Sequence, residues 1–205
     1  MKVLMLNGSP RSNSNTGVAL AQMEAVFREE GIECETRQVG ALDVRGCIAC
    51  ERCRKTGACA FDDVVNELAP VFEQADGLVV GAPVYFGSAN PTLVALLDRL
   101  FYSTHFDKTM KVGAAVCVAR RGGTSATYDE LNKFFALTGM PVANGQYWNS
   151  LHGRNVGEGM QDEEGLQQMR VLARNMAFLM KSIALGKEAF GMPRTEKRVR
   201  TNFIR

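Results

Sequence analysis

The 205-residue sequence lacks several features that mark common classes of protein. No apolar stretch approaches the roughly 18 residues that cross a bilayer, because Arg, Asp or Lys interrupts each candidate segment. The formal net charge is only +2, so no strong field favours nucleic acid. The first apolar run, residues 2–6, is followed at once by a polar turn, which leaves no room for a signal peptide. We therefore expect a cytoplasmic protein that binds neither membranes nor nucleic acid.

Histidine is scarce, and this bears on the chemistry. His105 and His152 are isolated in the sequence, so no catalytic triad is predicted and no side chain is assigned a catalytic role. Six cysteines are present, but the cytoplasm keeps thiols reduced, which argues against structural disulfides. Cys34 and Cys117 lie in apolar strand candidates and are expected to be small buried hydrophobes. The other four crowd into residues 47–59.

Short β-rich runs alternate with amphipathic segments along the chain. Strands are predicted at residues 2–6, 34–39, 77–82, 111–119 and about 142–149, and helices at 16–30, from 62 or 63 past 72, and at 91–102, 124–138 and 162–185. This alternation requires right-handed crossovers and predicts a doubly wound, five-stranded parallel sheet in a three-layer α/β/α arrangement. We expect one domain, residues 1–186, with a cysteine-rich insert at 40–61. Ligands should bind at the carboxyl ends of the strands.

The segment 7–16 follows the first strand and opens a helix. It offers several hydroxyls, a tight turn at Gly8, the positive charge of Arg11 and the unpaired N–H groups of a helix start. Neither a Walker loop nor the dinucleotide fingerprint is present. The segment predicts a monophosphate site, and the competing interpretation is an ordinary Ser/Asn-rich turn with a helix cap.

Two further loops follow the third and fourth strands. In residues 81–91, Tyr85 and Phe86 offer flat apolar surface to an aromatic ring, and the glycines let the backbone approach it. Residues 120–124 form the other loop.

Three motifs, Gly-Ser-Pro-Arg-x-x-Ser-x-Thr at 8–16, Pro-Val-Tyr-Phe-Gly at 83–87 and Arg-Gly-Gly at 121–123, resemble the NADPH-dependent FMN reductase family. The resemblance implies a flavodoxin-like fold, bound FMN, NAD(P)H as a co-substrate and a homodimer or homotetramer. It also implies which residues hold the flavin. The phosphate would contact Ser9, Arg11, Ser12, Ser14, Asn15 and Thr16, and the isoalloxazine would be bordered by Pro83, Val84, Tyr85, Phe86, Gly87, Arg121, Gly122 and Gly123.

The four crowded cysteines form a C-x2-C-x2-C-x5-C run. Such spacing is that of bacterial-type iron–sulfur sites, although the last gap here is five residues rather than three and Ala60 stands where ferredoxins have proline. The run resembles that of the iron–sulfur flavoproteins, a branch of the same family. This resemblance implies one [4Fe-4S] cluster held by Cys47, Cys50, Cys53 and Cys59.

Other interpretations of the cysteines stay open. Four thiolates also suit structural zinc, whose usual arrangement is two separated pairs. Cys47 and Cys50 could form a redox dithiol. The chain could also be an FMN reductase that keeps the cysteines without a cluster.

Three functions follow from these alternatives. The first is an electron-transfer iron–sulfur flavoprotein that passes electrons between the cluster, FMN and a small acceptor such as a quinone, an oxygen species or a carrier protein. The second is an NAD(P)H-dependent FMN or quinone reductase without a cluster, and the third is a non-enzymatic flavin-binding carrier.

The end of the chain, residues 187–205, lacks apolar periodicity and is rich in basic residues. Phe203 and Ile204 would expose apolar surface in water. We expect either a solvated tail or a tail that packs on a second subunit.

Overall fold

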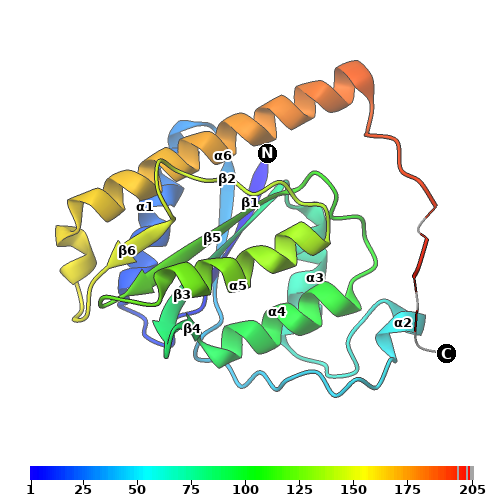
Figure 1. Ribbon diagram of the computed structural model, residues 1–205, viewed down its shortest axis with the longest axis horizontal. Helices are drawn as coiled ribbons and strands as arrows, with labels where there is room; N and C mark the ends of the chain where they lie inside the picture. Colours follow the sequence, from blue (N-terminus) through cyan, green and yellow to red (C-terminus); the bar gives the residue numbers. More distant parts are fainter. Residues whose placement is uncertain (198, 202, 204–205) are drawn as a thin grey trace.

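Five parallel strands form the centre of the computed structural model (Figure 1), which describes residues 1–197, 199–201 and 203. The strands lie in the order β2-β1-β3-β5-β6, the flavodoxin-like order. A sixth strand, β4, is a two-residue antiparallel addition to the end of β3. The strand bounds are β1 (Lys2–Asn7), β2 (Glu33–Gln38), β3 (Gly77–Tyr85), β4 (Ser88–Ala89), β5 (Val112–Ala119) and β6 (Ser150–His152).

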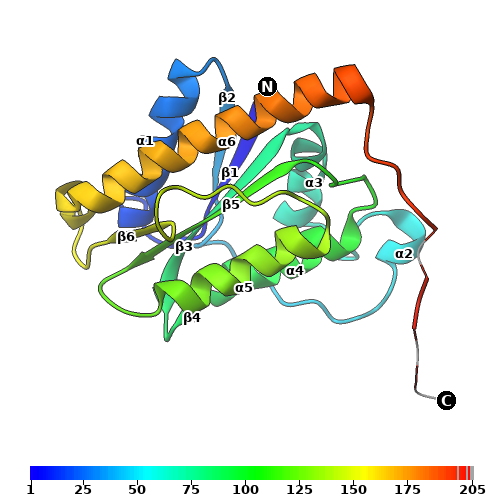
Figure 2. The same ribbon diagram turned by 45° about the horizontal axis from the view of Figure 1, so that its top comes forward.

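Helices cover both faces of the sheet (Figure 2). One face carries α1 (Asn15–Glu29) and α6 (Glu163–Phe190), and the other carries α3 (Val64–Gln74), α4 (Pro91–Ser103) and α5 (Thr124–Leu137). Each face has its own apolar core, because side chains of the parallel strands point alternately to the two layers. The predicted three-layer α/β/α fold is confirmed. Two short helices complete it, α2 (Cys53–Thr56) in the cysteine insert and the 3-10 helix η1 (Glu158–Gln161).

The predicted fifth strand at 142–149 is wrong. The chain touches β5 at Val142, opposite Gly113, and pairs again only at Ser150, opposite Cys117. Between these two pairings β5 advances by four residues, from 113 to 117, whereas the other segment advances by eight, from 142 to 150. Residues 143–149 therefore bulge out of the sheet. The carboxamide of Gln168 accepts the N–H groups of residues 146 and 147 at 3.0 and 3.1 Å, which replaces the missing ladder. The regular strand therefore starts at Ser150.

Two other boundaries differ from those predicted. Strand β3 continues to Tyr85, so residues 81–85 of the loop predicted at 81–91 are strand. Helix α6 continues past the predicted residue 185 to Phe190, which makes the first residues of the predicted tail helical. Phe190 and Phe203 are both 90% exposed. The tail residue Ile204 lies outside the described residues. In the described part of the chain, no helix combines the length and apolar character needed to span a bilayer.

The two cysteines outside the insert are packed against the cores. Cys117 is fully buried in β5 and Cys34 is half-buried in β2. Burial raises the pKa of the Cys117 thiol to about 12 and that of the Cys34 thiol to about 11. Both thiols are therefore protonated near neutral pH and behave as small hydrophobes, as predicted.

Candidate functional site

The loop between β1 and α1 lies tightly against its neighbours. The N–H of Gly8 donates to the carbonyl of Gly81 at 2.8 Å, which ties the loop to β3. Gly40, after β2, passes so close that a Cβ there would lie 1.9 Å from the Gly8 oxygen. Only glycine permits this approach, so residues from three parallel strands fix the path of the loop.

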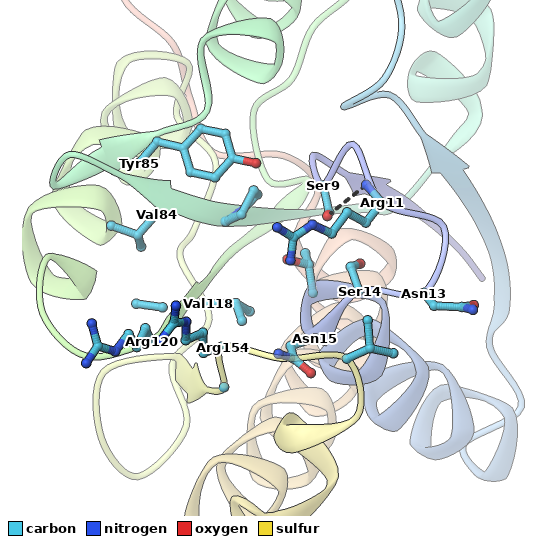
Figure 3. A pocket seen from close by; sticks show the side chains of 15 residues that line it. Ser9, Arg11, Asn13, Ser14, Asn15, Val84, Tyr85, Val118, Arg120 and Arg154 are labelled. Carbon is cyan, nitrogen blue, oxygen red and sulfur yellow. Dashed lines mark hydrogen bonds between the residues drawn. The ribbon is translucent and has the colours of Figure 1, made fainter.

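The first turn of α1 presents hydrogen-bond donors at the end of this loop. The Ser14 hydroxyl caps the helix by accepting the N–H of Gly17 at 3.0 Å. Among the described residues, no protein acceptor receives the backbone N–H groups of Asn15 and Thr16. The Ser9 hydroxyl accepts the N–H of Arg11 at 3.3 Å, a local bond within the loop (Figure 3). Such a helix terminus binds anions.

A pocket of about 170 Å³ opens in front of these donors. Its walls come from the ends of four strands: the 9–16 loop, the end of β3, the end of β5 and the segment after β6 (Figure 3). Arg11, Arg120 and Arg154 line it, and no carboxylate does among the described residues. The pocket therefore selects for an anion.

The segment after β6 is held in place by two polar side chains. The Asn15 carboxamide donates to the Asn155 carbonyl and accepts the Gly159 N–H, both at 3.0 Å. The Glu158 carboxylate accepts the N–H groups of Asn155 and Arg154 at 2.9 and 2.6 Å. Those two backbone bonds lower the pKa of Glu158 below its usual value of 4.5. The segment is a fixed wall of the pocket at neutral pH.

The structure brings most of the predicted flavin residues together. Eight of them line the pocket: Ser9, Arg11, Ser14, Asn15, Thr16, Pro83, Val84 and Tyr85. Six do not: Ser12, Phe86, Gly87, Arg121, Gly122 and Gly123. Gly87 and Gly123 instead let the β3–β4 turn pack on the start of α5, since a Cβ on Gly123 would lie 2.9 Å from the Cα of Gly87.

Sequence reasoning missed seven lining residues. They are Asn13, Val118, Ala119, Arg120, Gly153, Arg154 and Val156. Arg120 is the first residue after β5, whereas the prediction chose its neighbour Arg121. The rule that ligands bind beyond the carboxyl ends of parallel strands pointed to residues 153–156 as well, but the misplaced fifth strand hid them.

The cysteine insert places its four thiols around a second cavity. Cys47 and Cys50 are exposed, Cys59 is half-buried, and Cys53 is buried at the start of α2. All four line one cavity with Ile48, Glu51, Ala60, Phe61, Arg99, Tyr102 and Ser103. Ala49 and Glu51, between these cysteines, have left-handed φ values of 52° and 57°. Non-glycine residues rarely adopt this conformation, which here coils the backbone tightly around the cavity.

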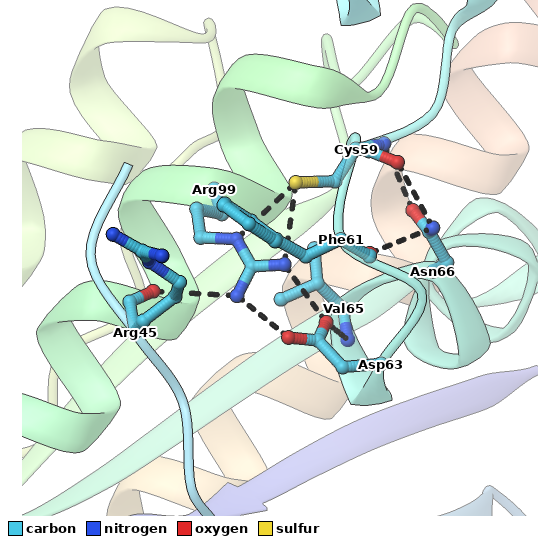
Figure 4. A network of polar contacts seen from close by, with 7 residues as sticks. All are labelled: Arg45, Cys59, Phe61, Asp63, Val65, Asn66 and Arg99. Atoms are coloured by element: carbon cyan, nitrogen blue, oxygen red, sulfur yellow. Dashed lines mark hydrogen bonds and ion pairs between the residues drawn. The ribbon is translucent and has the colours of Figure 1, made fainter. Parts of the chain in front are cut away.

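One thiol has a buried cation beside it. Arg99 of α4 is 1% exposed, and its Nε and Nη2 donate to Cys59 Sγ, both at 3.2 Å (Figure 4). The same guanidinium forms a bidentate pair with Asp63 at 2.7 and 2.8 Å. Burial acts to lower the pKa of Arg99, but the hydrogen bonds with Asp63 and Cys59 outweigh it and the pKa is raised. Arg99 is therefore charged.

The donor set fits a thiolate-held group. In the part of the chain that the structure describes, no three His, Cys, Asp or Glu side chains converge as a site for a single metal ion. The four thiols nevertheless share one cavity, and a guanidinium donates to one of the sulfurs. Soft sulfur ligands suit iron–sulfur clusters, zinc or Cu(I), whereas Mg²⁺ and Ca²⁺ require oxygen. The histidines take no part: His105 and His152 are exposed and line neither cavity.

Comparisons with known proteins agree with this architecture. The chain is 33% identical over 191 residues to an iron-sulfur flavoprotein of Methanocaldococcus jannaschii, covering 89% of this chain and 99% of the relative. It is 34% identical over 167 residues to an iron-sulfur flavoprotein of Methanosarcina thermophila, covering 77% and 87%. RosB, solved with a bound riboflavin 5'-phosphate derivative, superposes with a TM-score of 0.72 at 17% identity over all of this chain and 94% of its own. A flavodoxin from the Archaea superposes with a TM-score of 0.60 at 15% identity over 88% and 99%.

The last two similarities show the fold alone, but the first two extend over most of both chains. The family model described as NADPH-dependent FMN reductase matches residues 1–153, which contain the β1–α1 loop, the cysteine insert and the ends of all five parallel strands. The chain therefore belongs to the NADPH-dependent FMN reductase family, in its iron–sulfur flavoprotein branch, and is an FMN-dependent oxidoreductase.

Proposed function

We propose that the anion pocket holds the phosphate of FMN. Asn15 and Thr16 line it at the helix start, where their backbone N–H groups are available, and the hydroxyls of Ser9, Ser14 and Thr16 can add donors. Positive charge in the pocket comes from Arg11, Arg120 and Arg154. It is concentrated locally, since the formal net charge of the whole chain is only +2. Asn15 contributes through its backbone, because its side chain holds the segment after β6.

The isoalloxazine ring lies outside this small pocket in our proposal. A pocket of about 170 Å³ is below the roughly 300 Å³ at which whole drug-sized ligands become enclosed. Tyr85 lines both this pocket and a neighbouring, mainly apolar one that also includes Phe86. The ring would rest here, near Pro83, Val84 and Gly87, with Arg121, Gly122 and Gly123 on the outer side.

We further propose that the protein passes electrons between a [4Fe-4S] cluster on Cys47, Cys50, Cys53 and Cys59, the FMN and a small acceptor. One observation carries this proposal: the apolar pocket beside Tyr85 reaches Gly46, the residue before Cys47. The flavin and thiol cavities are thus linked through neighbouring residues of one subunit. A cluster supplies single electrons, and a flavin exchanges them singly or in pairs.

A second candidate is an NAD(P)H-dependent FMN or quinone reductase without a cluster. The exposure of Cys47 and Cys50 supports it, since half of the donor set lies at the open mouth of the cavity. An FMN reductase (NADPH) of Pseudomonas putida is 32% identical over 101 residues, about half of each chain. In this second candidate NAD(P)H is the electron donor, whereas the first candidate takes electrons from an external donor; the acceptor is a small molecule or a redox carrier protein.

Iron and acid-labile sulfide, measured on protein purified without oxygen, separate the two candidates. About four irons and four sulfides per chain, together with one FMN, are expected for the cluster-containing protein. Bound FMN without iron or sulfide would contradict the cluster and favour the second candidate. Protein that takes up no added FMN would contradict both.

We also propose a cytoplasmic homodimer or homotetramer, in which the end of the chain packs on a second subunit. The exposed Phe190 and Phe203 support this, because two aromatic rings in solvent are unfavourable. Light scattering on the full chain and on a chain ending at residue 190 tests it. Loss of assembly in the shortened chain is expected, and an unchanged monomer in both would contradict the proposal.

A further inference from the structure

Arg99 is a fully buried cation whose hydrogen bonds are directed at a proposed cluster ligand (Figure 4). We propose that Arg99 is a positioning residue that fixes the Cys59 sulfur toward the cavity and raises the reduction potential of the cluster held there. Asp63 acts against it by offsetting the charge of Arg99. This inference rests on the proposed cluster function and assigns two residues outside the cysteine motif to its control.

The guanidinium uses its whole donor set. Two N–H groups go to Cys59 Sγ, two go to the Asp63 carboxylate, and the fifth goes to the Arg45 carbonyl at 3.3 Å. Five donors in a fixed planar fork therefore have five acceptor contacts, which sets the orientation of the group completely. A lysine ammonium has three donors and no fork, so it cannot hold the sulfur and the carboxylate in the same way.

The backbone of Cys59 is clamped as well. Its N–H donates to Asn66 Oδ1 at 2.9 Å, and Asn66 Nδ2 donates back to its carbonyl at 3.2 Å and to the Phe61 carbonyl at 3.1 Å. The Phe61 ring lies 5.0 Å from the Arg99 guanidinium carbon on the same network. Cys59 is thus held by main-chain and side-chain contacts, whereas Cys47 and Cys50 are exposed. Cys59 is therefore a preorganised sulfur for the proposed cluster, with contacts to both its backbone and its side chain.

The electrostatic consequence follows from burial. A charge at 1% exposure is poorly screened, and Asp63 balances only part of its effect at the sulfur. Reduction by one electron adds negative charge to a group that four thiolates already make anionic. Hydrogen bonds to ligand sulfurs and nearby charge are the features by which a protein tunes such a cluster. Arg99 favours the reduced state, and Asp63 disfavours it.

Two substitutions with opposite expected effects test this inference. Arg99→Gln should lower the midpoint potential of the reconstituted cluster by about 59 mV, which corresponds to a tenfold change in the one-electron redox equilibrium. Asp63→Asn should raise the potential, because it removes the offsetting charge while keeping an oxygen that can accept the Val65 N–H. The potential is read by EPR-monitored titration of the [4Fe-4S] signal with a chemical reductant, and bound iron is measured on the same samples.

Arg52→Gln is the matched control. It removes the same charge next to Cys53, but the Arg52 side chain is exposed. The redox equilibrium of the cluster should therefore change by less than about threefold. Arg99→Lys keeps the charge and loses the fork, and its potential should lie between those of the native protein and Arg99→Gln. If Arg99→Gln fails to retain iron, Arg99→Lys and Asp63→Asn decide the question.

The outcomes separate this inference from the proposed function. If the native protein takes up no cluster, the proposed cluster function falls and the role of Arg99 falls with it. If the native protein is loaded, but Arg99→Lys and Asp63→Asn leave the potential unchanged or shift it in the same direction, only the role of Arg99 is overturned.

Discussion

The side-chain oxygen of Asn15 accepts the backbone N–H of Gly159 at 3.0 Å, joining residues 144 positions apart. Asn15 stands in the first turn of α1, and Gly159 lies in η1 after the last strand. A Cβ on Gly159 would lie 3.1 Å from that oxygen, so the two segments are in close contact. This bond ties the segment that carries Arg154 to the start of α1, on the opposite wall of the pocket.

Asn15→Ala should weaken FMN binding without abolishing it. The substitution removes both side-chain bonds to the segment after β6, so the wall of the pocket must be ordered on binding. We expect roughly tenfold weaker binding, corresponding to about 1.4 kcal/mol. Flavin fluorescence quenching measures it. Asn13→Ala is the control, since Asn13 lines the pocket but is exposed. Equal losses in the two variants would contradict the role of Asn15.

Neighbouring arginines after β5 should differ in importance. Arg120 lines the anion pocket and Arg121 does not. Arg120→Gln should weaken FMN binding by roughly tenfold, the effect of losing one charge-assisted hydrogen bond, and should reduce its salt dependence. Arg121→Gln should change affinity by less than about twofold. Titrations at low and high salt check both, and a larger loss for Arg121→Gln would support the assignment made from the sequence motif.

The Glu158 carboxylate should couple flavin binding to pH. Its pKa is lowered by backbone hydrogen bonds from Asn155 and Arg154. Above the usual pKa of 4.5, the ionised carboxylate therefore contributes fully to holding the segment after β6. That contribution is lost as the pH falls through the lowered folded value. Glu158→Gln should therefore bind FMN more weakly at pH 7, and the difference from the native protein should shrink as the pH falls below 4.5. Glu163→Gln, an exposed position in the same region, should show no such convergence. A difference that stays constant with pH would contradict the role of Glu158.

Gly40→Ala should destabilise the fold through the β1–α1 loop. The added methyl would meet the Gly8 carbonyl, a backbone atom that cannot move aside as a side chain would. We expect about 3 kcal/mol lower free energy of unfolding in urea. Gly186→Ala in α6 is the control, because a Cβ there has no neighbour within 4 Å, and it should leave stability unchanged or slightly higher. Equal stability of the two variants would contradict the close-approach argument.

The cysteine run and the first helix show what the chain determines locally. Ser14 caps α1 three residues before Gly17, and both the hydroxyls and the helix start could be located from residue order. The alternation of apolar runs predicted the parallel sheet for the same reason, since side-chain periodicity is a property of neighbours along the chain. Likewise, the spacing of Cys47, Cys50 and Cys53 predicts a tight loop by itself, because only two residues separate each cysteine from the next.

Tertiary structure decided which residues share a cavity. Arg99 occupies a position in α4 that the sequence does not distinguish from any charged helix residue, and only the packing of α4 beside the insert brings it to Cys59. Gln168 accepts the N–H groups of residues 146 and 147 where a strand was predicted, and the regular strand β6 starts only at Ser150, with Arg154 just after its end at the pocket. Local order along the chain fixes caps, turns and periodicity, whereas buried polar groups find partners far away in sequence because they must be satisfied wherever the fold encloses them.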